Sequence, residues 1–175
     1  MACLLTTGRK LPCKTGFGGI KKVYFCDYGT LGAVTVDADG TISAIAGSEA
    51  WFEFDVKGNS SLETTVTSSR ENGTTFYTQT LNLTLPYLEN ATQQELQLLA
   101  VSRPHLVVED YLGNQFLCGL ENGVECTGGT IVTGAASGDL YGFTMTFEGQ
   151  EELAPAFIDS GVITSAISAT QITPN

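Results

Sequence analysis

FYTQTLNLTLP, residues 76–86, alternates apolar and polar side chains over most of its length. Leu81, Leu83 and Leu85 fall on one side of this alternation, and Thr and Asn residues fall on the other. A period of two is typical of a strand that has one buried face. Pro86 ends the pattern, because proline cannot donate a hydrogen bond to a neighbouring strand. These residues therefore predict a long strand that contributes one face of a core.

The same alternation recurs in residues 51–57 and 141–147. Shorter or more continuous apolar runs give further strand candidates, at residues 20–28, 31–36, 41–47, 62–69, 105–111, 115–120 and 124–133. We expect the fold to be mainly β, an antiparallel β-sandwich or an open barrel.

Turn dipeptides separate many of these runs. Asp39-Gly40, Asn72-Gly73, Gly113-Asn114 and Asn122-Gly123 are all typical of hairpins. The Gly113-Asn114 turn is expected to pair strand 105–111 with strand 115–120, and the Asn122-Gly123 turn to continue that meander into 124–133.

One short α-helix is expected at about residues 92–102. Thr92 and Glu95 have the spacing of a capping box, in which each side chain satisfies a free backbone N–H group. Pro104 closes the segment. A single helix between two groups of strands predicts a lid on the sandwich.

The whole chain, residues 1–175, has the length of one domain with a substantial core. Two segments lack a core pattern, at about residues 7–19 and 153–175. We expect them to be extended terminal arms that become ordered against a neighbouring subunit.

Charge is unevenly distributed along the chain, whose net charge is −11. Residues 1–26 contain basic residues and no acid, whereas residues 104–175 contain nine acids and no Lys or Arg. We interpret the basic residues as inter-subunit contacts to an acidic neighbour; the alternative is that they only solvate an edge strand. The five basic residues are Arg9, Lys10, Lys14, Lys21 and Lys22.

The five cysteines include Cys118 and Cys126, which are close enough in sequence to form a disulfide across a turn. An odd cysteine count without a CxxC spacing instead favours buried free thiols in a reducing cytoplasm. The first residues lack the pattern of a signal peptide, and no apolar run is long enough for a membrane helix. We therefore expect synthesis and assembly in a cytoplasm and no membrane partner.

Motifs for catalysis, cofactors or metals are weak. His105 is the only histidine, and a lone histidine before a strand is usually structural. Residues 8–15, GRKLPCKT, resemble a phosphate-binding loop, but Cys13 replaces the required glycine and Pro12 removes an N–H donor. Residues 37–40 resemble the start of a calcium loop without its later ligands. The sequence predicts no catalytic, cofactor-binding or metal-binding residue, and hence no enzyme.

Three stretches resemble a known group of proteins: residues 11–29, residues 59–88 and residues 129–157. They are similar to virion proteins of tailed bacteriophages that infect gut bacteria, including the crAss-like phages. In residues 138–151, a Gly-Asp pair precedes an aromatic-alternating strand and a Gly-Gln-Glu sequence; this pattern contributes most to the resemblance.

The resemblance implies a tail-tube type of sandwich that oligomerises into a ring or tube in a phage tail, neck or connector. Its partners would be copies of itself and neighbouring tail, connector or portal proteins, and its channel would let DNA pass without binding it. An acidic channel wall fits this function, because like charge repels phosphate. The alternative is a monomeric carbohydrate- or protein-binding β-sandwich of the adhesin kind, for which Trp51 gives limited support.

Overall fold

The computed structural model describes residues 7–47, 50–56, 58–163, 167 and 172. It confirms the expectation of a mainly β fold with two sheets and one short helix. The elements are β1 (Ile20–Cys26), β2 (Ala33–Val36), β3 (Ile42–Ala46), β4 (Phe52–Asp55), β5 (Ser61–Ser69), β6 (Thr74–Pro86), α1 (Asn90–Val101), β7 (His105–Asp110), β8 (Gln115–Cys118), β9 (Glu125–Val132), β10 (Gly142–Glu151) and β11 (Ala156–Ile158).

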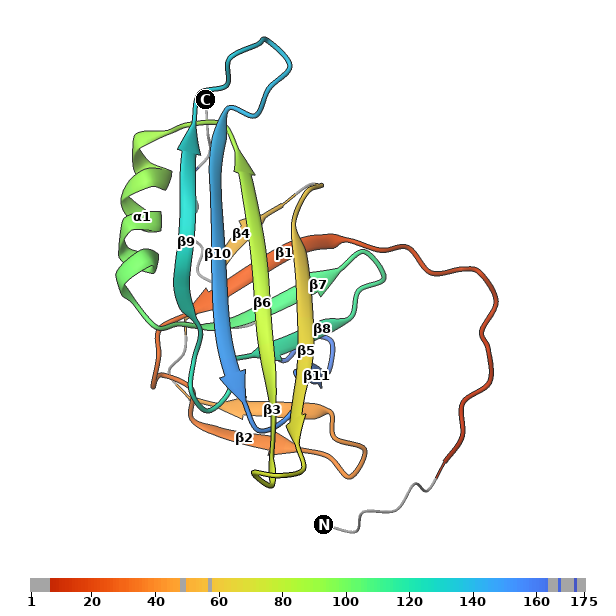
Figure 1. Ribbon diagram of the computed structural model, residues 1–175. Helices are drawn as coiled ribbons and strands as arrows, with labels where there is room; N and C mark the ends of the chain where they lie inside the picture. Colours follow the sequence, from red (N-terminus) through yellow and green to blue (C-terminus); the bar gives the residue numbers. More distant parts are fainter. Residues whose placement is uncertain (1–6, 48–49, 57, 164–166, 168–171, 173–175) are drawn as a thin grey trace.

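The strands form two sheets that face each other (Figure 1). The small sheet has the order β5–β6–β10–β9, and the large sheet has the order β2–β3–β11–β8–β7–β1–β4. Pairings between the named strands are antiparallel except the contact of β11 with β3, which is parallel. The strand expected from residues 76–86 is β6, at the centre of the small sheet.

The main core lies between the two sheets. Leu81 and Phe147 enter it from the small sheet, and Val23, Phe25 and Leu106 enter it from the large sheet. The rings of Phe25 and Phe147 are 5.2 Å apart. Leu81, Leu83 and Leu85, every second residue in the last part of β6, lie in this core, which explains the alternation in its sequence.

A second core covers the opposite face of the large sheet. Tyr24 of β1 and Val107 of β7 point into it, and Trp51 and Ile163 pack over them. The large sheet is therefore buried on both faces at β1 and β7, so these two strands have continuous apolar runs instead of alternation.

Helix α1 lies beside β9 and buries Leu96 against the main core (Figure 1). It begins two residues earlier than expected, and the predicted capping box is wrong. Glu89 is the N-cap residue and makes no side-chain cap hydrogen bond, so Thr92 and Glu95 lie inside the helix. The early start follows from Tyr87, whose positive φ of 78° turns the chain sharply after β6.

The predicted meander through Asn122-Gly123 is also wrong. After β8 the chain leaves the large sheet, and β9 pairs with β10 of the small sheet. Gly119 and Gly123 have positive φ, and the Glu151 carboxylate accepts hydrogen bonds from the backbone of Glu121 and Asn122. These contacts fix the segment in which the chain passes from the large sheet to the small sheet. The other three hairpin turns connect β2 with β3, β5 with β6, and β7 with β8, as expected.

The two segments expected to be arms differ from each other. Residues 7–19 are exposed and lie outside both sheets, as an extended arm should (Figure 1). Within 153–175, however, residues 156–158 form β11 and Ile163 is buried in the second core. An extended arm is therefore the wrong description of residues 156–163, because their apolar side chains cover the subunit's own sheet. Most of 164–175 lies outside the described residues.

Candidate assembly surface

The basic arm, residues 7–19, carries three of the five predicted contact residues. Arg9, Lys10 and Lys14 are all exposed, and the arm contains no acid. Its attachment point is Phe17, whose ring meets that of Tyr111 edge to face at 5.2 Å. The arm therefore presents three positive charges to its surroundings.

Lys21 and Lys22, the other two predicted contacts, lie in β1 and are paired within the subunit. A β-bulge between Ile20 and Lys22 interrupts the register with β7. Lys21 Nζ lies 3.0 Å from Glu109 Oε1, and Lys22 Nζ lies 2.7 Å from Glu53 Oε1. The structure thus separates these lysines from the basic arm, and their role as contacts between subunits stays a prediction.

Glu109 is a buried carboxylate at the centre of a polar network. Besides Lys21, the hydroxyl of Tyr24 and the side-chain amide of Gln115 donate to its Oε2, each at 3.1 Å. Burial alone would raise the pKa of Glu109, but these three donors outweigh burial and lower it. Burial and the nearby Glu109 carboxylate raise the pKa of Tyr24. The network therefore holds one negative charge inside the fold, next to the start of the arm.

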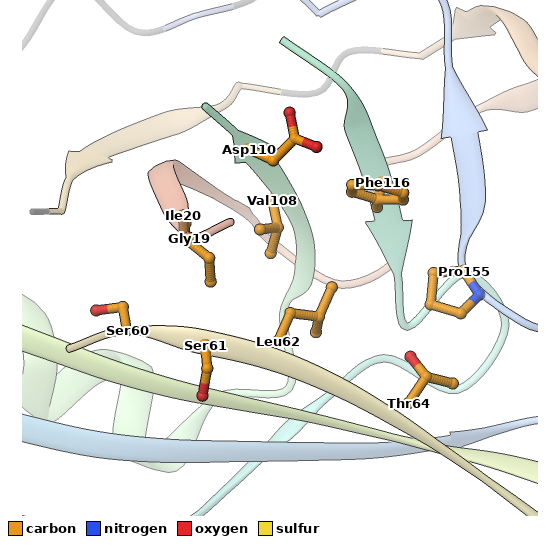
Figure 2. A pocket seen from close by; sticks show the side chains of 10 residues that line it. All are labelled: Gly19, Ile20, Ser60, Ser61, Leu62, Thr64, Val108, Asp110, Phe116 and Pro155. Atoms are coloured by element: carbon orange, nitrogen blue, oxygen red, sulfur yellow. The ribbon is translucent and has the colours of Figure 1, made fainter. Parts of the chain in front are cut away.

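An apolar cleft of about 400 Å³ opens between the two sheets on the side of β5 (Figure 2). Leu62 lies on the small-sheet side of the cleft, and Val108 and Phe116 lie on the large-sheet side (Figure 2). Among the described residues, Asp110 is the only charged one that lines it. The complete lining consists of Gly19, Ile20, Ser60, Ser61, Leu62, Thr64, Val108, Asp110, Phe116 and Pro155.

The outward face of the small sheet is polar and acidic. Glu63 pairs with Thr80, Thr80 pairs with Glu148, and Glu148 pairs with Glu125. Directly paired residues share one face, so three carboxylates form a row across all four strands. We call this the glutamate row. The four strands contain no Lys, Arg or His at all. The register between the strands brings these three glutamates together. They are far apart in the sequence, so the sequence alone did not predict the row.

The lone histidine is held by the backbone. His105 is buried, its Nδ1 is 2.6 Å from the Gly119 carbonyl oxygen, and its Nε2 accepts the Gly29 N–H at 3.2 Å. These two partners require a neutral ring with its proton on Nδ1. The sheet register places Cys26 opposite His105, but both ring nitrogens are already occupied. A second cavity, of about 440 Å³, lies beside this histidine, between Tyr28, Val34 and Leu120.

The remaining sequence motifs form local structure. Asp37 and Asp39 bind Ser43 and Thr41 within the β2–β3 turn. In the part of the chain that the structure describes, no group of three His, Cys, Asp or Glu residues is placed to hold a metal ion. Residues 8–15 lie in the basic arm and lack regular structure.

The described cysteines are free thiols, so Cys118 and Cys126 are not joined. Burial raises the pKa of Cys118 to about 12, which keeps this thiol protonated at neutral pH. Cys26 is also buried, as expected, whereas Cys13 is exposed on the basic arm and Cys126 is half-buried.

Among the described residues, no helix has both the length and the apolar composition needed to cross a membrane. No protein-family model, no curated protein and no solved structure matches this chain.

Proposed function

We propose that this protein is a structural subunit that assembles with copies of itself into a ring or tube, in the tail or connector of a bacteriophage. In this proposal the ring surrounds a channel through which DNA passes, and the neighbours of the ring are other tail, connector or portal proteins. The resemblance of three sequence stretches to phage virion proteins motivates the setting, with assembly in the host cytoplasm.

The observation that carries self-assembly is the basic arm. This arm extends away from a subunit whose net charge is −11. It carries three exposed cations and the exposed side chain of Leu11. An isolated subunit gains little from such a segment, whereas an acidic neighbour would attract it. Fully extended, the twelve steps from residue 7 to residue 19 reach roughly 40 Å, which is sufficient to reach an adjoining subunit.

The sheet edges support the same function. Among the described strands, β5 and β9 end the small sheet, and β2 and β4 end the large sheet. Such edges leave backbone groups without a partner strand and favour contact with another chain. A closed ring covers them in a defined way.

The glutamate row supports the passage of DNA. A channel wall must not hold phosphates, and a face with carboxylates and no cations repels them. We therefore assign the outward face of the small sheet to the channel wall.

Light scattering over a concentration series, with electron micrographs of the same samples, tests self-assembly. We expect rings or short tubes of fixed subunit number. The double variant Lys10→Glu/Lys14→Glu should assemble less well and melt at the same temperature as the parent protein. Arg70→Glu, at an exposed turn outside the arm, is the control and should assemble normally. A parent protein that stays monomeric at every concentration would contradict the proposal.

One observation favours the alternative of a monomeric binding module. Tyr87 and Tyr141 are 47% and 46% exposed, and their rings meet at 5.9 Å. Exposed aromatic rings of this kind can bind a sugar or a protein, whereas Trp51 is completely buried and cannot. Glycan binding by a monomer that is lost in Tyr141→Ala would favour this function.

A further inference from the structure

The main core is closed on one side of the molecule and open on the other. Helix α1 covers the side next to β9, where Leu96 fills the space between the sheets. On the side of β5 no helix of the described residues covers the core, and the apolar cleft remains there (Figures 1 and 2). A cavity of about 400 Å³ lies within the range of sites that hold a ligand or several side chains.

The basic arm contains a segment of matching chemistry. Leu11 is 97% exposed, and Pro12 follows it. A residue before proline favours an extended backbone, which suits a narrow space between two sheets. Lys10 and Lys14 flank this apolar pair with positive charge. Among the described residues that line the cleft, Asp110 is the one carboxylate and there is no cation. The Asp110 carboxylate accepts hydrogen bonds from Leu112 and Asn114 in the β7–β8 turn and keeps its negative charge for a lysine.

We propose that residues 9–14 of one subunit bind in the cleft of the neighbouring subunit, with Leu11 between the sheets and the flanking lysines toward Asp110. This inference rests on the proposed self-assembly and identifies the surface that the arm uses. It also accounts for an exposed leucine and an open core in the same chain, because each would cover the other in the assembly.

The arm's own path favours a neighbouring subunit over its own cleft. Phe17 packs on Tyr111 and fixes the arm where it leaves the body. A Cβ atom built at Gly8, Gly16 or Gly18 would meet no other atom within 4 Å, so this part of the arm lies clear of its own subunit. Gly19, at the base of the arm, lines the subunit's own cleft, whereas Figure 1 shows the rest of the arm leading away from the two sheets.

Disulfide trapping tests the proposal, because Cys13 already lies on the arm. In a Cys3→Ser background, a tagged chain that keeps Cys13 is mixed with an untagged chain carrying Cys13→Ser and Thr64→Cys. Thr64 lines the cleft. After mild oxidation we expect a covalent pair of one tagged and one untagged chain on a non-reducing gel.

The matched control is Thr65→Cys in place of Thr64→Cys. Thr65 is the next residue of β5 and is also exposed, but its side chain points to the opposite face. Equal trapping at both positions would overturn the proposal. So would a disulfide that forms only within one chain when Cys13 and Thr64→Cys are combined, because that result places the arm in its own cleft.

Leu11→Asp gives a second readout. It should raise the concentration needed for assembly by at least about tenfold, since it removes the burial of a leucine side chain. The melting temperature should not change, because Leu11 contacts nothing in the subunit's own core. Normal assembly without trapping would overturn this inference and leave the proposed function standing. A protein that never assembles would overturn both.

Discussion

His105 shows how a single residue couples the fold to pH. Burial, aided by Arg103, lowers its pKa more than the Gly119 carbonyl and the Glu151 carboxylate raise it. Tyr28 stacks on the imidazole at 5.0 Å. Protonation would also turn Nε2 from an acceptor into a donor that faces the Gly29 N–H. The folded state therefore resists the charged form of this ring.

This gives a prediction with a definite sign. Above the ordinary histidine pKa of about 6.5, the ring is neutral in both the folded and the unfolded chain, and the protein keeps its full free energy of unfolding. Below it, the unfolded chain takes up a proton that the folded chain does not, so the free energy of unfolding falls by up to about 1.4 kcal/mol per pH unit. Urea unfolding at pH 7.5 and 5.5 measures the loss.

The matched variant is His105→Gln, which removes the titrating group. We expect it to be less stable than the parent at pH 7.5, because it loses the ring's packing and at least one of its two hydrogen bonds. Its stability should differ little between pH 7.5 and 5.5. A pH dependence as large as that of the parent protein would show that other groups cause the loss.

At the scale of an element, α1 is anchored by packing more than by its ends. Leu96 is buried, yet Glu89 at the N-cap makes no side-chain cap hydrogen bond, and its Oε2 is buried without a partner. A helix of twelve residues depends on tertiary contacts in any case. The start of this helix is therefore a weak point that a single substitution can improve.

We predict that Glu89→Ser stabilises the protein by about 0.5–1 kcal/mol. Serine is a preferred N-cap residue, and it would replace a buried carboxylate oxygen that lacks a partner. The midpoint of urea unfolding measures the change. Glu95→Ser, at an exposed position within the helix, is the control and should be neutral or slightly destabilising. Destabilisation by Glu89→Ser would show that the carboxylate has a structural role.

Elements were predictable from the sequence where their signals were local. The alternation along β6 and the Asn72-Gly73 turn predicted a strand and its hairpin, and both are present. The crossing at Asn122-Gly123 was not predictable, because the Glu151 carboxylate that holds it lies 30 residues away from Glu121. The ion pair between Lys21 and Glu109 was not predictable for the same reason, because these residues are 88 positions apart in the sequence.

At the scale of the whole molecule, the two faces of the small sheet have opposite chemistry. The inner face supplies the core, and the outer face carries the glutamate row without any cation. In the proposed ring, this subunit would turn the glutamate row toward DNA and its basic arm toward a neighbouring subunit.

We predict that the parent protein binds duplex DNA weakly at about 0.1 M salt, because its outward sheet repels phosphate. The triple variant Glu63→Lys/Glu125→Lys/Glu148→Lys should bind DNA measurably, and binding should fall steeply with salt. The control changes three exposed glutamates on separate loops, Glu71, Glu121 and Glu152, to Lys. Filter binding or fluorescence anisotropy measures both. Tight DNA binding by the parent protein would contradict the assignment of this face.

The position of β1 between β7 and β4 in the large sheet has a consequence for synthesis. Its register joins Cys26 to His105 and Phe25 to Leu106, so one edge of β1 stays unpaired until β7 has been made. At a translation rate of about 5–20 residues per second, this delay lasts several seconds. During that time Val23, Tyr24 and Phe25 form an exposed apolar segment of the kind that a ribosome-associated chaperone can bind.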